Sequence, residues 1–154
     1  MLDEQARAFF ESACGLVIGL ADAERRPYAQ RGWGARVVDG RLRLVVPGDD
    51  PYLAELATPG AAIAVTGADV RTLRGLQAKG HVIALGPAAP ADHAHMLRHC
   101  DELFDTIVEL DGIPRQLVER MRPATYAVCE IEVESLFDQT PGPGAGRPTA
   151  EQQA

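Results

Sequence analysis

Residues 15–47 decide the fold and read GLVIGLADAERRPYAQRGWGARVVDGRLRLVVP. The run from Gly15 to Ala21 is short and apolar, which predicts a buried strand. After a polar turn, Tyr28 to Val38 is expected to form a second strand. Asp39-Gly40 is the dipeptide typical of a type I′ turn, whose twist matches that of a hairpin. Arg41 to Val46 should therefore return beside the second strand as a third.

Outward from this stretch, apolar periodicity predicts three more strands and four helices. Helices are expected over residues 3–13 and 51–56, over a longer segment carrying Met96 to Ile107, and near residues 113–121; strands are expected over 61–66, 73–85 and 126–133. Hairpin connections dominate, and strands do not alternate with long helices. The pattern predicts an α+β fold, a six-stranded antiparallel β-barrel with flanking helices.

The length of 154 residues indicates one domain. We expect the barrel to occupy residues 1–137. Residues 138–154 are rich in glycine and proline and have no apolar periodicity, so we expect them to form a flexible C-terminal tail.

Composition excludes several classes of function. The net charge of −7 argues against a nucleic-acid partner, which favours a basic surface. No apolar run approaches the roughly 18 residues needed to cross a membrane, and the N-terminus does not resemble a signal peptide. The three cysteines, Cys14, Cys100 and Cys129, lie in apolar patterns without paired spacing, which predicts buried, reduced thiols. A cytoplasmic location follows as an expectation.

The charges are unevenly distributed along the chain. Between Arg25 and Lys79 there are nine basic and five acidic residues, whereas the rest of the chain is strongly acidic. A locally basic middle in an acidic protein favours a small anionic ligand over an anionic polymer. Scattered, solvated arginines on strand faces are an equally good interpretation of the same pattern.

Polar side chains inside two predicted strands are the candidate ligand contacts. In the second strand, Gly32 and Gly34 flank Trp33, and we expect open backbone there that a planar ligand could approach. In the sequence, Arg31 precedes this Gly-Trp-Gly segment and Arg36 follows it. In the fifth strand the candidates are Thr72, Arg74, Gln77 and Lys79. Arginine suits bidentate phosphate contacts, although arginines on edge strands also serve to prevent aggregation.

No catalytic or metal-binding motif accompanies these residues. His95 and His99 share a helical face, but no HExxH arrangement surrounds them, so a solvated helix flank is the favoured interpretation. Nucleophile elbows, phosphate-binding loops and zinc spacings are missing from the sequence. The catalytic residues therefore stay unknown, and no metal is predicted.

The order of these segments resembles a known family. Gly15 to Asp22, PYAQRGW at 27–33, the hairpin, LVVP at 44–47, LAEL at 53–56 and the strand ending QAKG at 77–80 resemble the pyridoxamine 5′-phosphate oxidase-like FMN-binding split barrels. The tail FDQTPGPGAG at 137–146 is similar to that of a subgroup of small oxidase-related proteins. The resemblance implies a split barrel and a homodimer with FMN in clefts at the subunit interface.

The resemblance also implies roles for individual residues. Arg31 corresponds to the arginine that contacts the flavin phosphate, and Arg36 to the polar or basic residue five places on. Val45, Val46 and Pro47 correspond to the backbone along the flavin ring, and Gln77 to the glutamine of the fifth strand. The implied function is that of a flavin-dependent oxidoreductase with a small-molecule substrate. True pyridoxamine phosphate oxidase activity is not expected, because the C-terminal Trp and Arg-rich segment is missing.

Asp49 and Asp50 depart from the family pattern. They stand where flavin-binding members carry a basic pair for the phosphate, and two carboxylates would repel it. Two alternatives therefore stay open. One is a non-enzymatic ligand-binding or scaffold dimer that has lost FMN. The other is the same barrel holding deazaflavin or heme, with His81 or a helix histidine as axial ligand.

Overall fold

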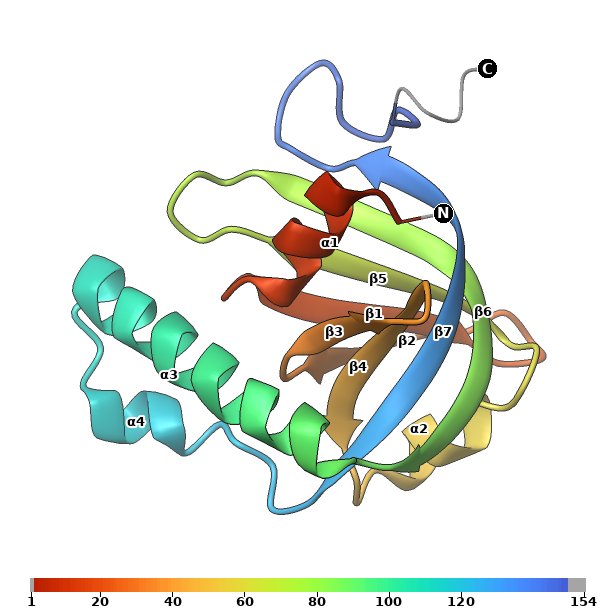
Figure 1. The fold of residues 1–154 in the computed structure, drawn as a ribbon, viewed down its shortest axis with the longest axis horizontal. Helices are drawn as coiled ribbons and strands as arrows, with labels where there is room; N and C mark the ends of the chain where they lie inside the picture. Colours follow the sequence, from red (N-terminus) through yellow and green to blue (C-terminus); the bar gives the residue numbers. More distant parts are fainter. Residues whose placement is uncertain (1, 150–154) are drawn as a thin grey trace.

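Within residues 2–149, the part of the chain that the computed structural model describes, seven strands form one antiparallel sheet and four helices lie against it (Figure 1). The helices are α1 (Glu4–Glu11), α2 (Pro51–Leu56), α3 (Pro90–Asp111) and α4 (Arg115–Glu119). The strands are β1 (Gly15–Ala21), β2 (Pro27–Gly32), β3 (Ala35–Val38), β4 (Arg41–Pro47), β5 (Ala62–Ala68), β6 (Gly75–Pro87) and β7 (Tyr126–Asp138).

The strand order is β2-β1-β5-β6-β7-β4-β3, and every neighbouring pair is antiparallel. The long strands β6 and β7 bend the sheet into a barrel-like curve (Figure 1). The edge strands β2 and β3 leave it open. Where the chain leaves β2, the Trp33 amide donates to the Val45 carbonyl at 2.8 Å, and the Val45 amide donates to Gly34 at 2.9 Å. The predicted α+β antiparallel architecture is confirmed.

The predicted count of six strands is wrong, because the expected strand Tyr28–Val38 is divided at Gly34. Gly34 has a φ of +124°, a conformation that favours glycine, and the chain turns there. The residues before the turn pair with β1, and those after it pair with β4. The last strand also runs past Val133 to Asp138, because β6 supplies pairing partners along that length.

The turn and the helix cap that the sequence predicts have the expected geometry in the structure. Asp39 and Gly40 both have positive φ, 51° and 77°, as a type I′ turn requires. Asp50 caps α2, where its carboxylate accepts a hydrogen bond from the Leu53 amide at 3.0 Å. Pro51 occupies the first helical position, as its fixed φ favours.

The core has two parts. The larger part fills the inside of the curved sheet, and α1 contributes Phe9 and Phe10 to it. The smaller part lies between α3, α4 and the outer face of β4 and β7, with Trp33, Phe104 and Val128 among its buried members. Val128 is buried because α3 covers that side of β7. Half of the outer surface of the barrel is thus covered by helices.

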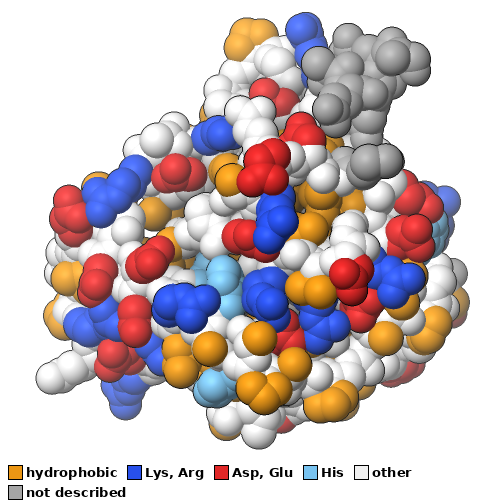
Figure 2. Space-filling model, in the orientation of Figure 1, with side chains coloured by type: hydrophobic (Ala, Val, Ile, Leu, Met, Phe, Trp, Pro, Cys, Tyr) orange, Lys and Arg blue, Asp and Glu red, His pale blue; other side chains and the backbone are white. Residues whose placement is uncertain are grey.

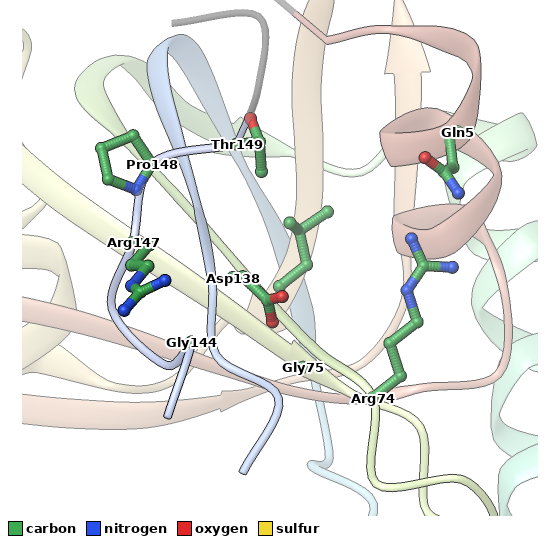
Figure 3. A pocket seen from close by; sticks show the side chains of 9 residues that line it. Gln5, Arg74, Gly75, Asp138, Gly144, Arg147, Pro148 and Thr149 are labelled. Carbon is green, nitrogen blue, oxygen red and sulfur yellow. The ribbon is translucent and has the colours of Figure 1, made fainter. Parts of the chain in front are cut away.

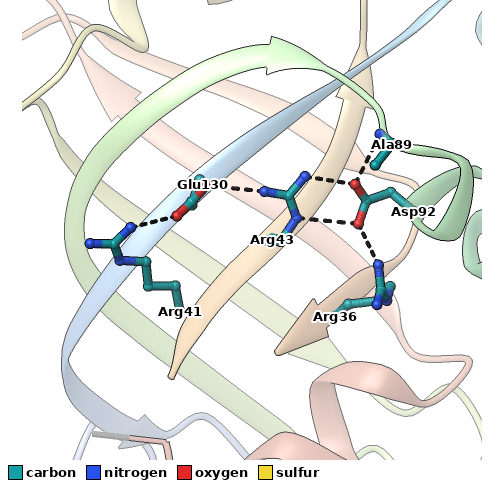
Figure 4. A network of polar contacts seen from close by, with 6 residues as sticks. All are labelled: Arg36, Arg41, Arg43, Ala89, Asp92 and Glu130. Carbon is teal, nitrogen blue, oxygen red and sulfur yellow. Dashed lines mark hydrogen bonds and ion pairs between the residues drawn. The ribbon is translucent and has the colours of Figure 1, made fainter. Parts of the chain in front are cut away.

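One buried carboxylate anchors α3 to the sheet (Figure 4). Asp92 is 1% exposed, and it accepts hydrogen bonds from Arg36 at 2.9 Å and Arg43 at 2.7 Å, and from the Ala89 amide at 3.1 Å. Arg43 also pairs with Glu130 of β7. Burial alone would raise the pKa of Asp92, but the hydrogen bonds, above all that from Arg43, hold it below its ordinary value. The carboxylate therefore stays ionised.

The described part of the tail folds back on the sheet. The Asp138 amide donates to Arg147 at 2.9 Å, and the Thr149 amide donates to Leu136 at 3.0 Å. The flexibility expected for residues 138–154 stays a prediction, and residues 150–154 lie outside the described residues. No helix within residues 2–149 is both long and apolar enough to cross a bilayer.

Replacing the buried charge should destabilise the fold strongly. We expect Asp92→Asn to lower the free energy of unfolding by about 3 kcal/mol, because Arg36 and Arg43 lose their shared counter-charge in a water-poor site. Asp105→Asn is the matched control: its carboxylate is 74% exposed beside Arg115, and its loss should cost at most about 0.5 kcal/mol. Urea unfolding of both variants measures the difference, and equal midpoints would contradict the anchoring role.

Candidate functional site

The uncovered half of the outer surface, formed by β2, β1, β5 and β6, carries three of the predicted site residues. Cross-strand pairing places Arg31, Val17, Thr66 and Gln77 in one row. The adjacent row contains Ala29, Gly19, Ala64 and Lys79. Side chains two residues apart on a strand share a face. Both rows therefore lie on one surface, which we call the platform.

Small side chains make the centre of the platform flat. No atom lies within 4 Å of the position that a Cβ would take at Gly19, and Val17 is 46% exposed. Neighbouring strands are about 4.8 Å apart, so the span from β2 to β6 is about 14 Å. A surface of this width and flatness suits a planar fused-ring system or a second sheet. Sequence reasoning missed Gly19, Ala29, Ala64 and Thr66, although the alternation of small and large side chains along β1 and β5 was a usable signal.

Polar and cationic groups border the platform on both sides. On β2, Arg31 lies 5.7 Å from the Trp33 ring and makes no ion pair with a carboxylate of residues 2–149. On β6, Gln77 donates to the Thr66 hydroxyl at 2.8 Å. The Lys79 ammonium lies 4.3 Å from the Phe137 ring, again without a carboxylate partner in the described chain. These cations can accept an anionic ligand without first breaking an ion pair.

A shallow hollow of about 490 Å³ lies at one end of the platform. Its floor is made by residues of β1 and β5, including Gly19 and Ala64, and its rim by Lys79, His81 and Glu134. His81 Nδ1 lies 2.8 Å from a Glu134 carboxylate oxygen. Both side chains remain substantially exposed, so the imidazole can be reached from solvent.

Several other predicted residues do not face the platform. Trp33 is 4% exposed and packs edge-on against Phe104. The open backbone expected beside it is not found, because a Cβ at Gly32 would lie 2.8 Å from Leu44. Gly34 is likewise closed in by α3. The burial of this segment under α3 depends on tertiary packing, which the local sequence of the strand does not predict.

Arg36 and the end of β4 are also engaged elsewhere. The Arg36 guanidinium is held by Asp92, which leaves it little freedom to bind a phosphate. Val45 and Val46 are buried, and Pro47 pairs with Tyr126 of β7. Their role along a flavin ring stays a prediction.

Thr72 and Arg74 lie in the turn between β5 and β6. The Thr72 hydroxyl accepts a hydrogen bond from the Arg74 amide at 3.3 Å. The Arg74 guanidinium lies 5.2 Å from the Phe9 ring of α1. This places both residues at an end of the barrel, away from the platform.

The Asp50 carboxylate has hydrogen-bond partners within the fold that the sequence did not indicate. Besides capping α2, its carboxylate accepts hydrogen bonds from the Tyr28 hydroxyl and from Gln30, the latter at 2.6 Å. Burial acts to raise the pKa of Asp50, but these bonds and that from the Leu53 amide lower it overall. The negative charge is thus largely used within the chain. Asp49 is exposed beside it.

Burial makes the cysteines poor nucleophiles. Burial raises the pKa of Cys14 and Cys100 to about 11 and that of Cys129 to about 12, so all three are thiols at neutral pH. The prediction that they are buried and unpaired is confirmed for the described chain. No group of three or more potential metal ligands occurs among residues 2–149. A side chain suited to nucleophilic catalysis is not found near the platform.

The expected solvated flank of α3 is wrong for His99. This side chain is 3% exposed, and its Nδ1 lies 3.0 Å from the Ser12 carbonyl, because the connection between α1 and β1 packs against α3. Burial lowers the pKa of His99 to about 4. The imidazole is therefore neutral at physiological pH.

Charges of both signs are interspersed on the face drawn in Figure 2, and no extended basic patch is visible there. That face contains α1 and α3 (Figure 1). The expectation that nucleic acid is not the partner stays a prediction.

No protein-family model and no curated protein matches the chain. Solved structures match over most of its length. HupZ of Group A Streptococcus is 16% identical, with a TM-score of 0.55 over 95% of this chain and 100% of that one. An F420 reductase is 15% identical, with a TM-score of 0.53 over 84% and 94% of the two chains.

Two further structures extend the range of neighbours. A Lactobacillus delbrueckii protein provisionally assigned as a pyridoxamine 5′-phosphate oxidase is 14% identical, with a TM-score of 0.51 over 88% of this chain and 93% of that one. HutZ, the heme storage protein of Vibrio cholerae, is 10% identical, with a TM-score of 0.50 over 89% and 94%. The chain has the pyridoxamine 5′-phosphate oxidase-like split-barrel fold, as the sequence predicted. The names of these neighbours include F420 and heme, so the fold alone does not select a cofactor.

Stability should depend on pH through His99. The unfolded histidine binds a proton below about pH 6.5 and the folded one only below about 4, so the unfolded state holds more protons between these values. The neutral imidazole makes its full contribution to the free energy of unfolding above about pH 6.5. As the pH falls toward 4, this free energy should decrease by about 3 kcal/mol. Urea unfolding at several pH values measures this slope.

Two variants test the assignment. His99→Gln should reduce the slope between pH 4 and 6.5, because this titrating group is gone and only smaller contributions remain, such as that of His95, whose pKa burial also lowers. His93→Gln should leave it unchanged, since His93 is exposed on the same helix. A slope in His99→Gln as steep as that of the parent would assign the titration to another group.

Proposed function

We propose that this chain is a cytoplasmic FMN-dependent oxidoreductase that binds the cofactor on the platform, at the interface of a homodimer, and acts on a small-molecule substrate. The observation that supports this best is the row Arg31–Val17–Thr66–Gln77, which places an arginine without a carboxylate partner in residues 2–149 and an amide on opposite sides of a flat surface. Flavin-binding sites need these features: a cation for the phosphate, a flat surface for the ring and hydrogen-bonding groups at the ring edge.

The residues of the platform fit this cofactor. Arg31 would hold the phosphate, because its guanidinium is exposed and can form two parallel hydrogen bonds with it. Gln77 and Lys79 would contact the polar edge of the ring from β6. When bound, FMN supplies the hydride chemistry, and the protein supplies binding and electrostatics. Asp50 does not oppose this arrangement strongly, since its carboxylate is already satisfied by Tyr28, Gln30 and the α2 amide.

A second copy of the chain is the partner that the platform favours. Its face is flat and apolar at the centre, and no element of residues 2–149 covers it. Two such faces would bury each other and enclose a ligand bound between them, and burial of apolar surface would drive the association. The dimer would exclude water from the ring, which a single open sheet face cannot do.

Heme binding is the second candidate function, and His81 is the observation that favours it. Its imidazole lies on the rim of the hollow, within reach of a ligand on the platform. The Glu134 contact at Nδ1 would orient the ring and leave Nε2 for the metal, an arrangement common among metal-binding histidines. Deazaflavin would use the flavin contacts, and a scaffold dimer would use the platform without a cofactor.

Cofactor titration should distinguish these functions. We expect FMN to bind with quenching of its fluorescence, and Gly19→Leu to abolish binding, because a side chain there covers the platform without a clash in the fold. Gly86→Leu is the matched control, since its Cβ position on β6 is also free of neighbours within 4 Å. Arg31→Gln should weaken FMN binding at least tenfold and riboflavin binding little, because riboflavin lacks the phosphate.

Three results would count against the flavin proposal. They are FMN fluorescence unchanged by the protein, equal affinity of Arg31→Gln and the parent for FMN, and a monomer in light scattering with or without FMN. Binding of F420 in place of FMN would support the deazaflavin alternative.

Heme binding has its own signature. If the chain holds heme through His81, addition of hemin should give a sharp Soret band that His81→Ala shifts or removes. His93→Ala, on the exposed side of α3, should leave the band unchanged. A Soret band identical in both variants and the parent would exclude His81 as the ligand.

A further inference from the structure

A second hollow, of about 480 Å³, lies at the end of the barrel between α1, the start of β6 and the folded-back tail (Figure 3). Gln5 and Arg74 form one wall, and Arg147, Pro148 and Thr149 form the opposite wall. Its volume is within the range of about 300–1,000 Å³ that is usual for small-molecule sites. None of its lining residues belongs to the platform.

The tail wall of this hollow is held by backbone hydrogen bonds. The Gln139 amide donates to the Gly75 carbonyl at 2.9 Å, and the Gly146 amide donates to Asp138 at 2.6 Å. The Thr140 hydroxyl accepts from the Gly75 amide at 3.1 Å. At Gly75 a Cβ would lie 2.8 Å from the Gln139 backbone, so the glycine permits this close approach. The hollow is thus built by specific pairing of the tail with β6 and β7.

Two arginines from segments far apart in sequence, Arg74 and Arg147, line the hollow, and neither has a carboxylate of residues 2–149 within ion-pair distance. By contrast, Arg36, Arg43, Arg71 and Arg115 all form ion pairs with such carboxylates. Arg74 contacts the Phe9 ring, which supports the guanidinium from one side. Arg147 extends from the tail wall.

Among the lining residues that belong to the described part of the chain, Asp138 is the one acid, and it lies between the two arginine walls in Figure 3. Its carboxylate accepts a hydrogen bond from the Thr140 amide at 2.7 Å. That bond, the Thr140 hydroxyl and the nearby Arg74 lower the pKa of Asp138, which therefore stays ionised. The lining carries a net positive charge within a chain of net charge −7. A small anion is the ligand that this combination favours.

We propose that the hollow between Arg74 and Arg147 is a second ligand site, which takes a small molecule bearing a phosphate or carboxylate group. The two guanidinium groups bind the anionic group from opposite walls, and the Thr149 hydroxyl and the Gln5 amide offer further hydrogen bonds. The site is independent of the platform and of the cofactor bound there. Because the tail supplies one wall, occupancy also holds the tail against β6 and β7.

Calorimetric titration with inorganic phosphate and with succinate tests this site. We expect saturable binding of at least one anion, weakened at least tenfold in Arg147→Gln and in Arg74→Gln, because each removes one charged contact. Arg120→Gln is the control: it removes an exposed arginine without an ion pair in the described chain, and affinity should change less than twofold. The preferred anion distinguishes a phosphate ligand from a carboxylate ligand.

The design separates this site from the flavin site. Arg31→Gln should leave the affinity for inorganic phosphate or succinate unchanged while it weakens FMN binding. Circular dichroism and the unfolding midpoint check that each variant folds, and Arg147→Gln alters an exposed side chain that lies outside both parts of the core. The proposal is overturned if neither anion binds saturably, if both Arg147→Gln and Arg74→Gln bind as the parent does, or if Arg31→Gln alone removes binding.

Discussion

The buried carboxylate of Asp92 is the interaction on which the arrangement of the surface depends. It joins the N-terminal end of α3 to Arg36 of β3 and Arg43 of β4. Arg43 in turn forms an ion pair with Glu130 of β7. A carboxylate this deeply buried is tolerated because every charge beside it is paired and hydrogen-bonded. It fixes α3 over one half of the barrel and so leaves the other half, the platform, uncovered. It also takes Arg36 out of the set of cations that can reach a ligand.

Turns and helix caps that depend on neighbouring residues in the chain could be predicted from the sequence. The Asp39-Gly40 turn and the α2 cap by Asp50 depend on residues adjacent in the chain, and both have the expected geometry. Gln77 and Lys79 could be placed on one face of their strand, because strand alternation has a period of two. The antiparallel α+β fold followed from these elements and from the short connections between them.

The errors have a common physical origin in contacts between distant segments. The glycines that flank Trp33 predict open backbone in its strand, but Phe104 and other residues of α3 and α4 bury the Trp33 side chain. His99 reads as part of a polar helix face, but the Ser12 carbonyl and the α1–β1 connection cover it. The break at Gly34 arises where α3 crosses the chain. Each of these depends on where α3 lies, and that position is fixed by Asp92, whose burial no local pattern reveals.

The arginines of this acidic chain divide into two groups once their partners are known. Arg36, Arg41, Arg43, Arg71 and Arg115 are bound to carboxylates and act as structural ties. Arg31, Arg74 and Arg147 are among the arginines that have no such partner within residues 2–149, and these three border a surface shaped to receive a ligand: the platform for Arg31 and the tail hollow for the other two. A net charge counts both groups alike. A cation that already pairs with a carboxylate contributes little positive potential at a ligand site. Of the basic residues between Arg25 and Lys79, only Arg31 and Lys79 therefore provide positive charge at the platform. The tail hollow gains its second cation from Arg147, which lies outside that basic middle, and only the folding back of the tail brings it beside Arg74.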